Sequence, residues 1–283
     1  MVGNGYGWLR RRAARVATAV VAGVAGGGLV VACSAEAVTK AGPVDDAPRP
    51  TIVLEHGAFA DGSSWNAVIE KLRKDRYPVV AAANPLRGPA NDAASLRGLI
   101  SKIDGPVVLV GHSYGGSVIS AAAAGNDKVK GLVYVAAFLP AVGENALELT
   151  NKFPGSTLPG TLNPVAYTGV DGVAQTDLYI QQDKFRAQFA ADVPESEAAL
   201  AAAAQRPIAQ AALEERATVA GWQDKPSWDI VTTEDLNIPV QAQRFMAERA
   251  HATVTEVKAS HSVAVSHPDV VADVIEQAAA AAH

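Results

Sequence analysis

The residues best placed to do chemistry form a Gly-x-Ser-x-Gly motif at residues 111–115, with Ser113 at its centre. An apolar run at residues 106–110 precedes the motif and predicts a buried strand, and a small, Ala-rich run at 117–125 predicts a helix. In such a strand–turn–helix the serine occupies a tight, strained turn with its hydroxyl clear of the sheet. Glycines two residues to either side avoid collisions that a Cβ would cause. The pattern therefore predicts a nucleophile at Ser113.

A serine hydroxyl is a weak nucleophile at neutral pH, so it needs a base to accept its proton. The chain has six histidines. His261 lies in a loop just after a predicted strand at residues 253–257, late in the chain, and is the expected base. The other five are assigned to turns, to the serine motif, to helix ends or to the chain terminus: His56, His112, His251, His267 and His283.

The base in turn needs a carboxylate that holds its tautomer and stabilises the imidazolium. A predicted strand at residues 228–233 is followed by two acids, Glu234 and Asp235. Asp235 is the preferred partner, because it lies further past the strand and precedes Pro239, where a new helix can start. Glu234 remains the alternative.

A tetrahedral oxyanion needs two donors aimed at it. One is the backbone N–H of Tyr114, directly after the nucleophile. The other is expected from the loop after the first predicted strand, where the N–H of Ala58 is the best candidate. Phe59 would then reach into the substrate pocket, with ordinary core packing as the alternative.

These side chains require a rigid frame, and the hydrophobic pattern predicts one. Nearly continuous apolar runs alternate with helical periodicities, which indicates an α/β fold with a parallel sheet covered on both faces and ligands at the carboxyl ends of the strands. The expected strands are residues 51–57, 78–83, 106–110, 129–136, 228–233 and 253–257. The expected helices are residues 65–76, 92–103 with Asp92 as N-cap, 117–125, 239–250 and 268–282.

Residues 137–226 break this rhythm, and the expected insertion spans about residues 141–226. Residues 140–176 are rich in Pro, Gly, Thr and Asn, whereas 177–189 and 195–220 look helical, the second with an interruption at Pro207. An insertion here, before the last two strands, predicts a helical cap over the pocket.

The N-terminal 37 residues predict an export signal, because an arginine cluster precedes a small, uncharged stretch at residues 16–32. Two outcomes compete. Residues 30–33 resemble a bacterial lipobox, in which Cys33 would be lipidated and anchor a cell-envelope lipoprotein, whereas cleavage after Ala37 would release a secreted protein. Residues 38–50 then predict a linker, and 51–283 the folded domain.

The chain has 283 residues, of which 49% are hydrophobic and 19% charged, a composition typical of one large globular domain. Its net charge of −5, without basic stripes, argues against a nucleic-acid partner. One cysteine excludes an intrachain disulfide. The predicted chemistry requires no metal or cofactor. Contact with a membrane is expected only through the lipid anchor at Cys33.

With these residues in place, the chain resembles the α/β-hydrolases. More narrowly, it resembles the branch of plant methyl esterases, hydroxynitrile lyases and many bacterial esterases, over about residues 51–283. Four stretches carry the likeness: His56-Gly-Ala-Phe-Ala-Asp-Gly-Ser-Ser-Trp65, Gly111-His-Ser-Tyr-Gly-Gly116, Val133-Tyr-Val-Ala-Ala-Phe138 and Ala259-Ser-His-Ser262. The order serine, acid, histidine is that of the family. Because the first strand already leads into the oxyanion turn, the resemblance implies six parallel strands instead of eight.

The resemblance implies a serine hydrolase that cleaves a small carboxylic ester through an acyl-enzyme. Plant hydroxynitrile lyases carry a lysine directly after the triad histidine, and Ser262 stands there instead, which favours ester hydrolysis. Ser113 disfavours the dehalogenases and epoxide hydrolases of this fold, which use an aspartate. The alternatives are other triad chemistry, namely C–C bond cleavage or acyl transfer, and a non-enzymatic ligand-binding lipoprotein on the same fold.

Overall fold

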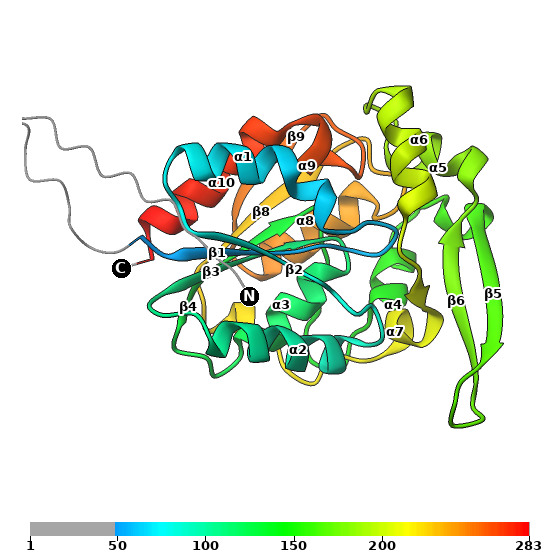
Figure 1. Cartoon of the computed structure of the whole chain (residues 1–283), viewed down its shortest axis with the longest axis horizontal. Helices are drawn as coiled ribbons and strands as arrows, with labels where there is room; N and C mark the ends of the chain where they lie inside the picture. Colours follow the sequence, from blue (N-terminus) through cyan, green and yellow to red (C-terminus); the bar gives the residue numbers. More distant parts are fainter. Residues whose placement is uncertain (1–48, 283) are drawn as a thin grey trace, which may run out of the picture. The chain divides into compact units, whose positions relative to one another are not determined.

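A computed structural model of the chain describes residues 49–282 and has a six-stranded parallel sheet at its centre (Figure 1). The strand order is β2-β1-β3-β4-β8-β9, and every neighbouring pair is parallel, which confirms the predicted parallel sheet. The strands are β1 (Thr51–Glu55), β2 (Val79–Ala82), β3 (Val107–His112), β4 (Val129–Val135), β8 (Ser227–Thr232) and β9 (Thr253–Val257). The predicted export signal, with Cys33 and Ala37, lies outside the described residues.

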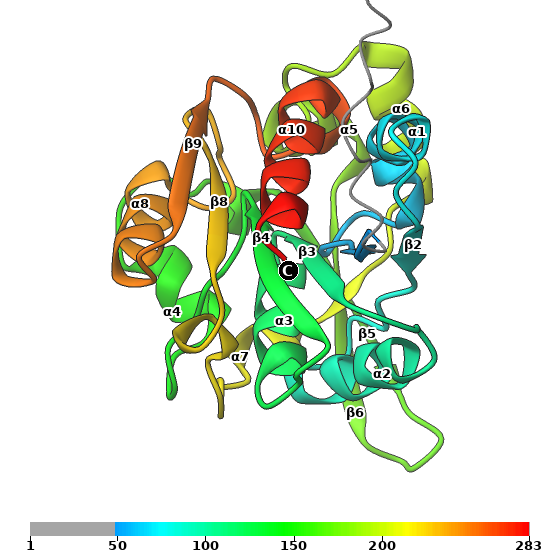
Figure 2. The ribbon, with the colours of Figure 1, turned by 90° about the vertical axis from the view of Figure 1, so that its left-hand side faces the viewer.

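Helices cover both faces of this sheet, as its uninterrupted apolar strands require (Figure 2). One face carries α1 (Asn66–Lys74), α9 (Val263–Ser266) and α10 (Pro268–Ala280). The other carries α2 (Pro89–Ser101), α3 (Gly115–Ala123) and α8 (Val240–Arg249). Along β1, Ile52 and Leu54 face the first layer and Val53 the second, all fully buried. Within residues 49–282, no helix has the length and apolarity needed to cross a membrane.

Helix α2 begins three residues earlier than predicted, so the expectation that Asp92 is its N-cap is wrong. Pro89 lies in the first turn, after Gly88. Asp92 is fully buried and accepts hydrogen bonds from the backbone N–H groups of Arg87 and Gly88, and from the hydroxyl of Tyr114 at 2.8 Å. The helical periodicity could not reveal this, because the partner tyrosine comes from the serine motif.

The insertion between β4 and β8 combines helices with a second sheet (Figure 1). Its helices are α4 (Ala146–Asn151), α5 (Gln182–Phe189), α6 (Glu195–Ala204) and α7 (Gln210–Glu214), with 3-10 turns η2 (Leu158–Thr161) and η3 (Gly221–Gln223). Its antiparallel strands are β5 (Leu162–Thr168), β6 (Ala174–Ile180) and β7 (Ile208–Ala209). One further 3-10 turn, η1 (Gly62–Trp65), follows β1 in the main body.

The helical expectation for the insertion is confirmed by α5 and α6, but the three-stranded sheet was missed. The helix expected from residue 177 is wrong at its start, because Asp177 lies in β6 and pairs with β5. In β6 only Leu178 and Ile180 are buried, so the alternation typical of a strand extends over too few residues to be recognised. The helix expected at residues 195–220 ends at Ala204, before Pro207.

Glycines at the β3–α3 turn allow backbones to approach closely. A Cβ on Gly111 would lie 2.6 Å from the carbonyl oxygen of Gly115, and a Cβ on Gly115 would lie 2.5 Å from that of Glu55. Both obstacles are backbone carbonyl oxygens, one in α3 and one in β1, so they cannot move away as the end of a flexible side chain could. The turn thus depends on the absence of these side-chain atoms.

We expect Gly111→Ala to lower the free energy of unfolding by about 2 kcal/mol or more, as overpacking a core does. Gly98→Ala is the matched control, because Gly98 lies in α2 and a Cβ added there would meet no other atom within 4 Å. That variant should be more stable than wild type by about 0.5–1 kcal/mol. Urea unfolding of the three proteins measures both changes, and equal effects at the two positions would contradict the packing argument.

Candidate active site

Ser113 occupies the turn between β3 and α3 in a left-handed conformation, with φ of 53°. A non-glycine residue there is strained and must be held by its surroundings. Its N–H donates to the carbonyl of Val135 at 3.2 Å, and its carbonyl accepts from the N–H groups of Phe138 at 3.1 Å and Gly116 at 3.0 Å. The end of β4 and the first turn of α3 therefore hold the serine in place.

The predicted base and acid meet at the carboxyl ends of β8 and β9. Nδ1 of His261 lies 2.6 Å from Oδ2 of Asp235, and both side chains are buried. An Nδ1–H that donates to a carboxylate leaves Nε2 as the proton acceptor of a neutral imidazole. His261 and Ser113 line the same cavity. The structure thus brings together the three residues that the sequence analysis selected.

Asp235 is fixed by its own loop and by α8. Its Oδ1 accepts from the N–H groups of Asn237 at 2.7 Å and Ile238 at 3.0 Å. Its Oδ2 accepts from Gln243 Nε2 at 3.0 Å and Thr232 Oγ1 at 3.1 Å, besides His261. These four further donors leave the carboxylate a single orientation, so it in turn orients the imidazole.

The alternative acid, Glu234, points away from this site. Its side chain is 53% exposed, and Oε1 lies 3.5 Å from Nζ of Lys258. A glutamate in that position belongs to a solvent-exposed ion pair, which contributes little to stability. The geometry therefore places Asp235, and not Glu234, against the histidine.

The two proposed oxyanion donors lie beside the serine. Ala58 and Tyr114 line the same cavity as Ser113, and neither backbone N–H has an acceptor among residues 49–282. The next N–H along the loop, that of Phe59, donates instead to the carbonyl of Arg206 at 2.9 Å. The arrangement leaves two backbone donors at the nucleophile, which is what an oxyanion requires.

The cavity is mostly apolar, with a volume of about 70 Å³. Phe59 forms part of its wall and packs edge-on against Phe189 of α5, with ring centroids 6.2 Å apart. Helix α4, turn η2 and α7 supply much of the remaining lining: Ala146, Leu147, Thr150, Asn151, Leu158, Pro159 and Leu213. The insertion therefore shapes the pocket, as expected of a cap.

The sequence does not indicate the contacts through which this insertion holds the histidine loop. The ring of Phe189 lies 4.9 Å from that of His261, and its carbonyl accepts from Ser262 Oγ at 2.9 Å. The carboxylate of Asp192 accepts from the N–H of Ser260 at 3.1 Å and from the Ser260 hydroxyl. No local pattern predicts these bonds, because the partners lie far apart in the chain.

Two other histidines near the serine support loops. His112 bonds through Nε2 to the carbonyl of His261 at 2.9 Å, and burial, assisted by the nearby His261, lowers its pKa well below the usual range. His56 accepts from the N–H of Asn84 at 3.1 Å, and burial lowers its pKa too. Both imidazoles are therefore neutral and hydrogen-bonded in place.

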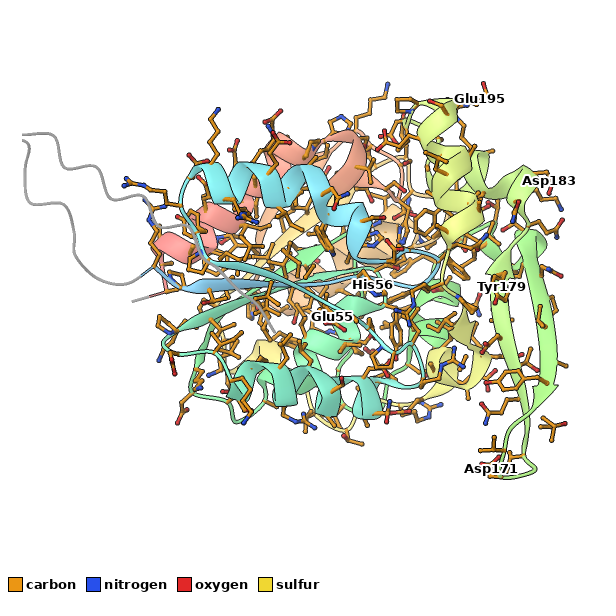
Figure 3. The ribbon with its side chains drawn as sticks, viewed as in Figure 1. Glu55, His56, Asp171, Tyr179, Asp183 and Glu195 are labelled. Carbon is orange, nitrogen blue, oxygen red and sulfur yellow. The ribbon has the colours of Figure 1, made fainter. Side chains whose placement is uncertain are left out.

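Glu55, the last residue of β1, lies inside the body of the protein next to His56 (Figure 3). Its side chain is 1% exposed, and Oε2 has no hydrogen-bond partner among the described residues. Burial, with a smaller contribution from Asp92, raises the pKa of Glu55 to about 8. The residue is thus a protonated acid next to the oxyanion loop at neutral pH.

A candidate nucleophile, a base oriented by an acid, and two free backbone donors are the parts that acyl transfer requires. The described residues hold no group of three or more His, Cys, Asp or Glu side chains that could bind a metal ion.

Comparison with known proteins gives a consistent picture. The sequence model of the alpha/beta hydrolase family matches residues 52–274. A curated relative, alpha/beta hydrolase nvfD from Aspergillus novofumigatus, is 25% identical over 82% of this chain and 97% of its own. The pyrethroid hydrolase of Sphingobium wenxiniae is 27% identical over 79% of this chain and 85% of its own.

Solved structures share the fold. Polyneuridine aldehyde esterase aligns with a TM-score of 0.71 at 19% identity, covering 81% of this chain and 98% of its own. A pyrethroid hydrolase from Sphingobium faniae aligns with a TM-score of 0.66 at 23% identity, over 82% and 97% of the two chains. The Arabidopsis methylesterase MES16 aligns with a TM-score of 0.68 at 18% identity, covering 82% of this chain and 99% of its own.

The assignment of the acid can be tested by exchanging each carboxylate for its amide. We expect Asp235→Asn to lower kcat for p-nitrophenyl acetate by about 10⁴-fold, because the amide no longer holds the Nδ1–H tautomer of His261. Glu234→Gln is the matched control and should retain wild-type kcat, since its side chain is solvent-exposed. A large loss in Glu234→Gln with little loss in Asp235→Asn would reverse the assignment.

The raised pKa of Glu55 predicts a pH-dependent stability. Between pH 4.5 and 8 the unfolded chain loses this proton while the folded chain keeps it, so this group makes folding less favourable as pH rises. The slope is about 1.4 kcal/mol per pH unit. Glu55→Gln, which mimics the protonated acid, should therefore gain stability relative to wild type by a few kcal/mol between pH 5 and 8. Urea unfolding of both proteins at pH 5 and at pH 8 measures this difference in the free energy of unfolding. If that free energy changed with pH equally in wild type and Glu55→Gln, the raised pKa of Glu55 would be contradicted.

Proposed function

The chain belongs to the alpha/beta hydrolase family, and from this premise we propose that it is a serine hydrolase that cleaves a small carboxylic ester. The observation that carries the proposal is the 2.6 Å contact between His261 Nδ1 and Asp235 Oδ2 at the cavity that Ser113 lines. A triad with two free oxyanion donors favours acyl transfer over passive ligand binding.

In the first half of the reaction, Ser113 Oγ attacks the ester carbonyl while His261 Nε2 accepts its proton. The carbonyl oxygen becomes an oxyanion, which the N–H groups of Ala58 and Tyr114 stabilise. The tetrahedral intermediate then collapses, and the imidazolium gives its proton to the departing alcohol. The products are the free alcohol and an acyl-enzyme on Ser113.

In the second half, water enters in place of the alcohol and attacks the acyl-enzyme. His261 removes a proton from this water, and the same two backbone donors hold the second oxyanion. Collapse breaks the acyl–Oγ bond, returns the proton to Ser113 and releases a carboxylic acid. In both halves Asp235 keeps its hydrogen bond to Nδ1 of His261 and stabilises the imidazolium.

The surroundings of the site support an uncharged ester. The cavity that Ser113 lines is mostly apolar, as pockets for small organic ligands are. Its apolar lining lacks a free charged side chain to bind an acidic substrate. Two of the structurally similar proteins, polyneuridine aldehyde esterase and the methylesterase MES16, carry the same class of reaction in their names.

Removal of the nucleophile tests the proposal directly. We expect Ser113→Ala to lower kcat for p-nitrophenyl acetate by about 10⁴-fold or more while the fold is retained, because acyl transfer loses its acceptor atom. A fluorophosphonate probe should label wild type and not the variant. Ser95→Ala, at an exposed position of α2, controls for the substitution itself.

Two outcomes would overturn the proposal. One is unchanged turnover in Ser113→Ala. The other is failure of the folded wild-type protein to hydrolyse any ester or to react with the probe, which would favour a ligand-binding role on the same fold.

A further inference from the structure

A second cavity of about 50 Å³ lies behind the active-site wall. It is bounded by the loop after β1, by α5 and α6 of the insertion, and by α9. Exposed residues of α6, among them Ala201, border it, so it lies close to the protein surface. Neither Ser113 nor His261 lines it, so it is distinct from the catalytic cavity.

An aromatic pair separates the two cavities. Phe59 lines both of them, and Phe189, which lines the second, meets it edge-on with an interplanar angle of 87°. The backbone of Phe59 is left-handed, with φ of 61°, and is held by its hydrogen bond to Arg206 in the insertion. Phe59 therefore forms part of the wall that the two cavities share.

The second cavity borders the segment that carries the histidine serving the leaving group. The departing alcohol oxygen must receive its proton from His261. The second cavity is lined by the direct neighbours of that histidine: Ser262, the next residue, and Phe189, whose ring lies 4.9 Å from the imidazole. The catalytic cavity is lined in part by α4 and η2, which do not line the second cavity.

We propose that the second cavity is the subsite for the alcohol half of the ester, and that Phe59 and Phe189 form the gate to it. The inference rests on the proposed esterase function and adds the substrate class. The acyl group occupies the catalytic cavity, the scissile carbonyl lies at Ser113, and the alcohol chain passes between the two phenyl rings.

The lining of the subsite defines the alcohol it takes. Ala60, Phe185 and Val265 present apolar surface, which suits an alkyl or benzyl chain. Asp61 lies at its border, and its carboxylate accepts from the N–H of Ser63 at 2.8 Å. A carboxylate at that border repels anionic alcohols. The substrate is thus an ester of a neutral, apolar alcohol.

Two series of esters test which cavity holds the acyl group and which holds the alcohol. In the first the acyl group is acetyl and the alcohol lengthens from ethanol to butanol, hexanol and benzyl alcohol. In the second the alcohol is ethanol and the acyl chain lengthens from acetyl to hexanoyl. We expect Phe59→Ala to raise kcat/KM for hexyl acetate relative to ethyl acetate by about tenfold, with little change in the acyl series.

A surface variant tests the subsite without altering the gate. Ala201→Trp, on the exposed side of the second cavity, should lower the hexyl-to-ethyl ratio by about tenfold, because the indole fills the space. Leu200→Trp is the matched control, since Leu200 is the adjacent residue of α6, is 73% exposed and lies outside the cavity. It should leave both series as in wild type.

The outcomes distinguish this inference from the proposed function. If Ala201→Trp leaves the alcohol series unchanged, or if Phe59→Ala shifts the acyl series instead, the subsite assignment is wrong while Ser113-dependent hydrolysis stands. If ethyl acetate is not hydrolysed by wild type and the fluorophosphonate probe fails to label Ser113, the proposed function itself falls.

Discussion

The site depends on how closely three backbone segments approach one another at the β3–α3 turn. A Cβ on Gly115 would meet the carbonyl of Glu55, and one on Gly116 would lie 2.4 Å from the carbonyl of Phe138. Because these contacts have no room for side-chain atoms, the ends of β1 and β4 pack directly against the start of α3. This packing holds Ser113 in its strained conformation and places the N–H groups of Ala58 and Tyr114 on the same side. The conformation of the proposed nucleophile and the placement of the proposed oxyanion donors are thus consequences of one packing constraint.

Buried carboxyl groups in this core behave differently according to the donors around them. Asp235 accepts hydrogen bonds from five groups and is thereby oriented towards His261. Asp229, within β8, is fully buried, and both of its oxygens lack partners among the described residues, so burial raises its pKa well above the usual range. Glu55 follows the second pattern. The hydrogen-bond donors that the fold supplies, and not the residue type, therefore distinguish Asp235, which orients the base, from Asp229 and Glu55, whose pKa values are raised.

The insertion does more than cover the pocket. Phe189 and Asp192 hold the loop that carries His261, so a displacement of α5 would be transmitted to the base. The same phenyl ring faces Phe59 at the boundary of the two cavities. In the proposed reaction, the element that positions the histidine also borders the path of the leaving alcohol. Ser262, which the sequence analysis noted for its residue type, bonds to this element through its hydroxyl.

The sequence by itself predicted the parallel sheet and placed Ser113, His261 and the candidate acids at the carboxyl ends of its strands, because strand, turn and helix patterns are local and the carboxyl ends of parallel strands meet at one edge. It left Glu234 open as the acid, missed the sheet formed by β5, β6 and β7, and gave Asp92 the wrong role. Only the tertiary structure decided these points, since each depends on a partner distant in the chain: the imidazole for the acid, β5 for β6, and the hydroxyl of Tyr114 for Asp92. Spacing specifies which residues reach the edge of the sheet, but not which atoms they meet there.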